Sequence, residues 1–134
     1  MRKFISFIAA ATTLVTSAIA VAQNEPLAVM VPGGGTYSRS ITTDSAQAQA
    51  FFDQGLRMAW SFYFPESIAS YQEAARLDPD SPMPHFGIAH AAGPNPNSRY
   101  VQLPDDPQGA GLAAIRRAMD LAKNGTQRES DMIN

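Results

Sequence analysis

The stretch AQAQAFFDQGLRMAWSFYFPESIASYQEAARLDP, residues 46–79, decides the fold. Its first half predicts a helix from Ala46 to Phe62, because apolar and small residues recur there at helical intervals. One stripe holds Phe51, Gly55, Met58, Ala59 and Phe62, and a neighbouring stripe holds Phe52, Leu56 and Tyr63. Pro65 favours the start of a second helix, and Pro79 ends it. The stretch therefore predicts an antiparallel helical hairpin.

The same pattern restarts downstream. Ser81 and Pro82 favour the start of a third helix, and Asp106 with Pro107 the start of a fourth, which Gly125 ends. The expected domains are a first hairpin over 44–79, a second over 81–124 with a long inserted loop over 93–107, and a truncated third hairpin over 126–134. Thr126 and Glu129 have the spacing of a capping box. We expect the last helix to lack a partner, to be frayed, and to belong to a longer protein.

The period and its residues resemble a tetratricopeptide repeat, because the restart near Pro82 comes about 34 residues after the start near Ala48. The resemblance assigns structural roles to Phe51, Gly55, Ser67, Tyr71, Ala74 and Pro79 in the first hairpin, and to Ile88 and Ala89 in the second. It places Tyr71 or Ala74 directly against Gly55. The motifs FDQGL (52–56), EAARLDP (73–79), GIA (87–89) and GPNPN (93–97) resemble exported bacterial tetratricopeptide proteins of largely unassigned function. The resemblance implies an all-α solenoid of stacked helix-turn-helix hairpins.

The first residues have the layout of a secretory signal peptide. Arg2 and Lys3 precede a charge-free run over 4–19, and Ala20-Val21-Ala22 has the small residues of a cleavage site. The rival interpretation, a transmembrane anchor, needs roughly 20 apolar residues. We expect a signal peptide over 1–22, a periplasmic or secreted chain, and no stable membrane insertion after cleavage. A flexible extended arm over 23–43 follows, with three glycines at 33–35 and a β-favouring stretch over 37–43.

Composition narrows the function. The chain has 134 residues, a net charge of −2 and no cysteine. The charge disfavours nucleic-acid binding, and the absence of cysteine excludes disulfides and thiolate metal sites. His85 and His90 are five residues apart, which does not suit a shared zinc site on a helix. We expect a core or groove role for these histidines, a helix cap at Asp105-Asp106, and no catalytic, cofactor or metal site.

The expected function is a non-catalytic scaffold that binds a protein or peptide partner in a concave apolar and aromatic groove. The first helices of the hairpins would line this groove with Phe52, Leu56, Trp60, Phe86 and His90, and the long loop would add Asn95, Asn97, Arg99 and Tyr100. The resemblance argues against a carboxylate clamp, because Phe52 and Leu56 stand where such clamps have Lys and Asn. Two alternatives remain. The chain could be the docking region of a larger secreted enzyme with its catalytic part beyond residue 134, or the arm could fill the groove.

Overall fold

The computed structural model describes residues 25–94 and 105–134 of the chain. Within these two ranges every regular element is helical. In chain order the elements are α2 (Ala46–Trp60), α3 (Phe64–Leu77), α4 (Pro82–Ala92), α5 (Pro107–Leu121), the short 3₁₀ helix η2 (Ala122–Asn124) and α6 (Gln127–Ile133). The all-α class predicted from the sequence is therefore confirmed for the part of the chain that the structure describes.

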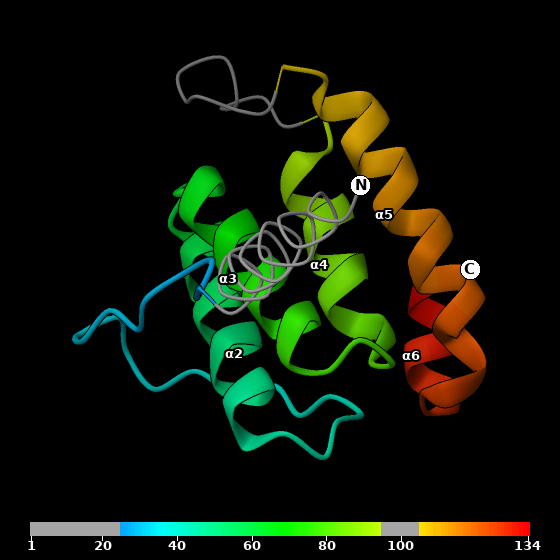
Figure 1. The fold of residues 1–134 in the computed structure, drawn as a ribbon, viewed down its shortest axis with the longest axis horizontal. Helices are drawn as coiled ribbons and strands as arrows, with labels where there is room; N and C mark the ends of the chain where they lie inside the picture. The colour runs from blue at the N-terminus through cyan, green and yellow to red at the C-terminus, as the bar shows by residue number, and fades with distance from the viewer. Residues whose placement is uncertain (1–24, 95–104) are drawn as a thin grey trace, which may run out of the picture.

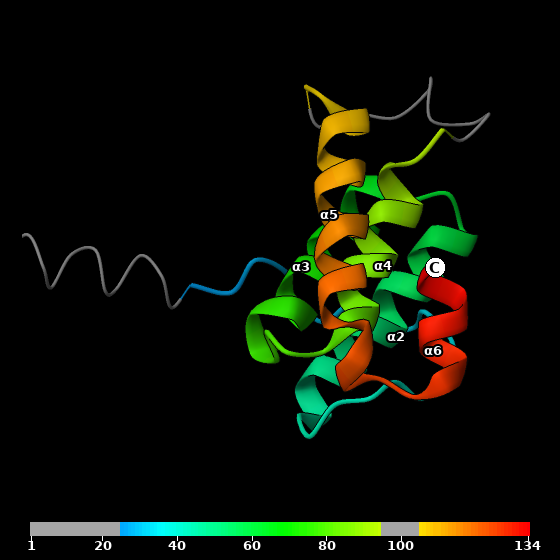
Figure 2. The same ribbon diagram turned by 90° about the vertical axis from the view of Figure 1, so that its right-hand side faces the viewer.

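Helices that follow one another in the sequence also pack against one another. α2 lies along α3, α3 along α4 and α4 along α5 (Figure 1). In addition, α2 contacts α4, and α6 contacts both α4 and α5 (Figure 2). The molecule is thus a row of packed helices, with α2 and α3 at one end and α5 and α6 at the other.

Two helix starts use the capping residues that the sequence predicts. The Asp106 side chain accepts a hydrogen bond from the Gly109 N–H at 2.9 Å at the start of α5. Thr126 and Glu129 form the reciprocal capping box at the start of α6. These bonds satisfy backbone N–H groups that have no partner within a helix, and so they set where both helices begin.

The end of α2 differs from the prediction, because the helix stops at Trp60 rather than at Phe62. Phe62 has a φ of 64°, and the Tyr63 N–H closes the helix by donating to the Met58 carbonyl at 2.9 Å. A left-handed residue at this place is usually glycine, because a side chain raises the energy of that conformation. The turn reverses the chain within three residues, so α3 starts at Phe64.

Tyr71 of α3 joins the first three helices. Its ring lies between Gly55 of α2 and Gly87 of α4, where an added Cβ would come within 2.7 Å and 2.6 Å of ring carbons. The Phe52 ring packs on the same tyrosine, with 5.4 Å between the centroids. The predicted contact between Gly55 and Tyr71 is confirmed. Glycine is needed on both sides because protein cores are close-packed and no larger residue leaves space for the ring.

The described part of the segment before α2, residues 25–43, is called the arm below. The sequence predicts a flexible arm, but the structure docks it on the helices. Main-chain N–H groups of the arm donate to helix side chains: Leu27 to Glu73 at 2.9 Å, Val31 to Gln54 at 2.7 Å, and Thr42 to Glu129 at 2.8 Å. Glu73, Gln54 and Glu129 are all buried. Buried polar groups need hydrogen-bond partners, and the arm supplies them.

α6 is docked as well, so the expectation of a final helix without a partner is wrong. Ile133 is buried, and Met132 packs against the core. The buried Glu129 accepts hydrogen bonds from Thr42 of the arm as well as from its own cap. The prediction failed because it counted only the apolar residues of α6 and left out the polar link to a segment 87 residues away.

Two carboxylates that hold the arm have lowered pKa values. The Arg76 side chain, hydrogen-bonded to Glu73, holds the pKa of that carboxyl below its ordinary value. Burial by itself would raise the pKa of Glu129, but hydrogen bonds from Thr42 and Thr126 lower it overall. A carboxyl group of this kind stabilises the fold above the pKa of the unfolded chain. That stabilisation is lost as the pH falls through the lower pKa of the folded state.

We therefore expect the urea midpoint of unfolding to decrease as the pH drops below 4.5, the ordinary glutamate value. The decrease should be smaller in Glu129→Gln, because glutamine does not titrate. The matched control is Glu66→Gln, which changes an exposed glutamate of α3 and should keep the full decrease. Urea titrations at several pH values measure this. Parallel curves for the parent chain and Glu129→Gln would contradict the role given to Glu129.

Candidate functional site

Four aromatic side chains gather at the end of α2 and point into solvent. Trp60 is 74 % exposed, Tyr63 61 %, Tyr37 59 % and Phe62 54 %. Trp60 ends α2, Phe62 and Tyr63 form the turn to α3, and Tyr37 comes from the arm. We call these four residues, together with Arg57, the aromatic surface. Large rings left open to water at one place mark an interaction surface more often than scattered exposed residues do.

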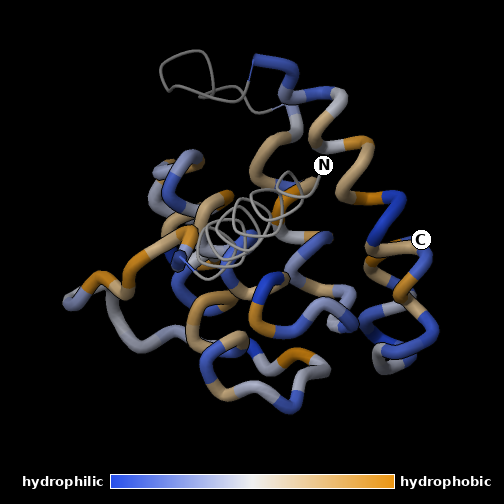
Figure 3. The backbone as a smooth tube through the Cα atoms, viewed as in Figure 1, coloured by the Kyte–Doolittle hydropathy of each residue, from blue (hydrophilic) through white to orange (hydrophobic). Residues whose placement is uncertain are grey.

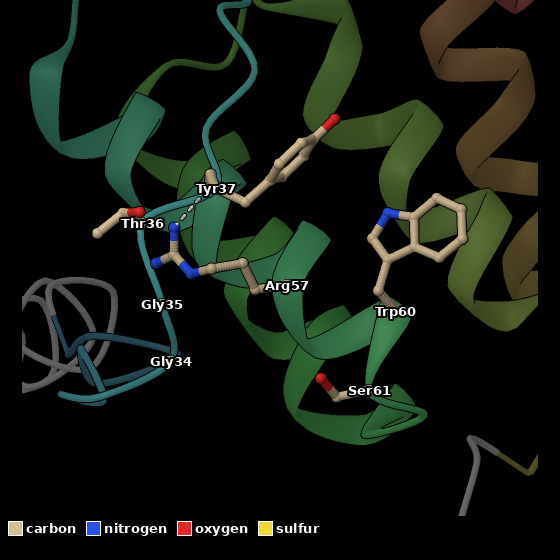
Figure 4. A pocket seen from close by; sticks show the side chains of 7 residues that line it. All are labelled: Gly34, Gly35, Thr36, Tyr37, Arg57, Trp60 and Ser61. Atoms are coloured by element: carbon tan, nitrogen blue, oxygen red, sulfur yellow. Dashed lines mark hydrogen bonds between the residues drawn. The ribbon is translucent and has the colours of Figure 1, made fainter.

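A pocket of about 450 Å³ lies within this surface. Its lining comes from the arm on one side and from the last turns of α2 on the other: Gly34, Gly35, Thr36, Tyr37, Arg57, Trp60 and Ser61. Figure 4 shows the rings of Tyr37 and Trp60 projecting from these two walls, with the Arg57 side chain reaching toward the arm. The docked arm is therefore part of the pocket.

Arg57 fixes the arm against α2 and brings a positive charge to the pocket. Its Nη1 donates to the Tyr37 carbonyl oxygen at 2.8 Å. Within the described ranges the one ion pair joins Arg76 to Glu73, so no carboxylate there lies within ion-pair distance of Arg57. A second pocket of about 360 Å³ shares Arg57 with the first, and its lining also includes Met58, Tyr63 and the acidic Glu66. The guanidinium can therefore receive a carboxylate or a carbonyl group from a bound partner.

The turn at Phe62 raises the energy of the backbone, because Phe62 is in the left-handed conformation. A non-glycine residue in the left-handed region costs roughly 1–2 kcal/mol. Phe62 recovers part of this cost through an edge-to-face contact with Phe64, with 6.2 Å between the ring centroids. Strained residues of this type concentrate at functional sites. The strain and the exposure of the same residue together single out this turn.

The structure spreads the predicted groove residues over different environments. Phe52 is 2 % exposed and packs on Tyr71, so its assignment to an open groove is corrected: it is a core residue. Leu56 and Phe86 are partly buried against the core. Trp60 and His90 are exposed, and the His90 ring stacks on Phe86 with 6.5 Å between the centroids. Neither Phe86 nor His90 lines the pocket beside Trp60.

The remaining predicted residues divide into two groups. Asn95, Asn97, Arg99 and Tyr100 lie outside the described residues. Among the repeat residues, Gly55, Ser67, Tyr71 and Ala74 are buried, Phe51, Ile88 and Ala89 are partly buried, and Pro79 is exposed. Ser67 also donates from Oγ to the Gly55 carbonyl at 2.7 Å, which binds α3 to α2.

Four residues of the aromatic surface were not predicted from the sequence to lie there: Tyr37, Arg57, Phe62 and Tyr63. The run SFYF over 61–64 was a usable signal, because adjacent aromatic residues at a helix end cannot all face one core. Nothing in the sequence pairs Tyr37 with Arg57, since the two are 20 residues apart in segments of different type.

The two histidines differ in environment. Burial, with a smaller effect of the nearby Arg117, lowers the pKa of His85, whereas His90 is exposed.

Within the described ranges no group of three or more His, Asp or Glu side chains is arranged to hold a metal ion. In the same ranges no helix is long and apolar enough to cross a membrane.

Comparison with known proteins identifies no relative. No family model matches the chain, and neither a curated protein nor a solved structure matches it. The packing of the helices and the aromatic surface are therefore the features that indicate the class of protein.

Proposed function

We propose that the chain is an exported helical-repeat scaffold of the tetratricopeptide type that binds a protein or peptide partner and has no catalytic site. The packing of successive helices supports the repeat assignment. So does Tyr71, because the first helices of both predicted hairpins place a glycine against its ring. In stacked repeats each unit is stabilised mainly by contacts with its neighbours.

The observation that carries the binding role is the aromatic surface. Trp, Tyr and Arg are the residues that most often dominate the energy of protein interfaces, and here they surround one pocket. Burial of exposed apolar surface by a partner contributes a favourable free energy of about 25 cal/mol per Å². A peptide with an apolar side chain would place that side chain between Tyr37 and Trp60 and direct a carbonyl or carboxylate oxygen to Arg57.

A peptide-library selection tests this proposal. Peptides selected on the immobilised full chain should bind in solution, and Trp60→Ala should weaken them by about 30-fold or more, as expected for an interface hot spot. The control is Met119→Ala, because Met119 is 49 % exposed but lies on α5, away from the pocket. Selected peptides that bind Trp60→Ala as well as they bind the parent chain would contradict the proposed site.

We propose export because the first 22 residues have the layout of a signal peptide, although these residues lie outside the described part of the chain. Intact-mass measurement of the protein secreted from a bacterial host should give a mature N-terminus at Gln23, or at Val21 if the earlier site is used. A product that stays in the membrane and retains Met1 would contradict export.

A further inference from the structure

The last part of the arm, residues 38–43, is held by helix side chains that bind its main chain. Asp53 of α2 accepts hydrogen bonds from the Arg39 N–H at 2.9 Å and from the Ser38 hydroxyl at 2.6 Å. Gln49, one turn earlier, donates to the Arg39 carbonyl at 2.9 Å and accepts from the Ile41 N–H at 3.0 Å. The Gln49 amide therefore pairs with the arm as a neighbouring strand would.

Two further helices complete the contact. Glu129 of α6 accepts from the Thr42 N–H at 2.8 Å and from the Thr42 hydroxyl. Ser81, at the start of α4, donates to the Thr42 carbonyl at 2.7 Å. We call Gln49, Asp53, Ser81 and Glu129 the main-chain clamp. Because three different helices supply its members, the clamp is built by the fold itself.

The chemistry of the clamp defines what it can hold. Five of its hydrogen bonds go to main-chain groups, so it recognises an extended backbone more than a particular sequence. Its two side-chain contacts are hydroxyls four residues apart that donate to carboxylates. Both charged members are acidic, and the segment they hold carries Arg39 and no acidic residue. A fitting segment is therefore extended, rich in Ser and Thr, and neutral or basic.

The arm is joined to the clamp mainly by polar contacts. Ile41 is the one apolar residue of this segment; it packs against the core but is only partly buried, while Ser38 and Ser40 are exposed. Upstream, Gly33 and Gly35 have φ values of 85° and 87°. The side chains of the apolar stretch 27–31 before them are largely exposed; this stretch is orange in Figure 3. Little buried apolar area thus has to be given up when residues 38–43 leave.

We propose that the main-chain clamp is a second binding surface, which takes an extended Ser/Thr-rich, neutral or basic segment of a partner protein in competition with the arm. The arm is its resident occupant within the chain. This surface is separate from the aromatic surface: none of its four residues lines the pocket beside Trp60.

The test uses a fluorescein-labelled peptide of residues 38–43 (SRSITT) with blocked ends, and fluorescence anisotropy on the full chain. In Arg39→Pro the arm loses the N–H group that donates a hydrogen bond to Asp53, while all four clamp residues are unchanged. The peptide should therefore bind this variant at least tenfold more tightly than the parent chain. Adding Asp53→Ala to Arg39→Pro should remove that gain, whereas adding Met119→Ala should keep it.

A second measurement on the unchanged chain covers the case in which Arg39→Pro does not fold. Saturating unlabelled SRSITT peptide should speed the hydrogen exchange of the Arg39 and Ile41 amides and leave the amides of α3 unchanged. Equal peptide affinity in the parent chain and Arg39→Pro, or a gain that survives Asp53→Ala, would overturn the proposal. So would unchanged exchange of Arg39 and Ile41 at saturating peptide.

Discussion

Replacing Tyr71 by alanine is expected to lower the free energy of unfolding by about 3–5 kcal/mol, the usual cost of truncating a buried aromatic residue. The Tyr71 ring is 1 % exposed and lies between two glycines on different helices. Neither glycine has a side chain that could move into the space, so the cavity would stay open. A small domain is stable by only about 5–15 kcal/mol in total, so this variant should be close to unfolding at room temperature.

Urea unfolding followed by circular dichroism measures the effect. Tyr63→Ala is the matched control, because it makes the same chemical change at a side chain that is 61 % exposed. Substitutions at such positions usually stay within about 0.5 kcal/mol. Equal losses in the two variants would mean that Tyr71 does not join α2, α3 and α4 in the way described.

Adding a single methyl group at Gly55 is the second large expected effect. In Gly55→Ala the new Cβ would lie 2.7 Å from the Tyr71 ring, so α2 and α3 must move apart. Overpacking of this kind costs about 1–3 kcal/mol. Gly111→Ala is the matched control, because Gly111 also lies within a helix but its Cβ would meet its neighbours at 3.7 Å, an ordinary contact.

The two alanine substitutions should therefore change the free energy of unfolding in opposite directions. Alanine in place of an unconstrained helical glycine stabilises a helix by up to about 1 kcal/mol. Gly111→Ala should raise the urea midpoint, while Gly55→Ala lowers it. A Gly55→Ala chain that is more stable than its parent would show that Gly55 is not a packing residue.

Local patterns in the sequence were enough to predict the parts of the fold that local interactions determine. The helical intervals from Phe51 to Ala59 placed α2, the Thr126 to Glu129 spacing predicted the capping box, and the place of Gly55 in the repeat pattern predicted its contact with Tyr71. Each of these depends on residues within a few turns of one another or within one hairpin.

Periodicity could not decide which of two apolar stripes on α2 faces the core. Phe51 and Phe52 are adjacent, and the structure buries Phe52 more completely, because it is the one that packs on Tyr71. A helix that is apolar over a wide arc presents both stripes equally well in the sequence. The groove assignment of Phe52 failed for this reason.

The sequence left a docked arm open as an alternative, but it could not locate the contacts, because they are polar contacts between distant segments. Asp53, Gln54 and Glu73 read as ordinary exposed polar residues of amphipathic helices, yet all three are buried under the arm. The turn at Phe62 was missed for a different reason: nothing in its residue type favours a left-handed conformation. As a result, the aromatic surface, which needs both the arm and this turn, was only partly foreseen through Trp60.

The docked arm builds one wall of the pocket and occupies the main-chain clamp, so both proposed binding surfaces depend on it. Hydrogen exchange of backbone amides in the full chain, measured by NMR, tests it residue by residue. We predict slow exchange for Arg39, Ile41 and Thr42, whose N–H groups donate to Asp53, Gln49 and Glu129. Exchange of these three amides at the rate of an unstructured peptide, while the amides of α2 stay protected, would contradict the docking of the arm on the helices.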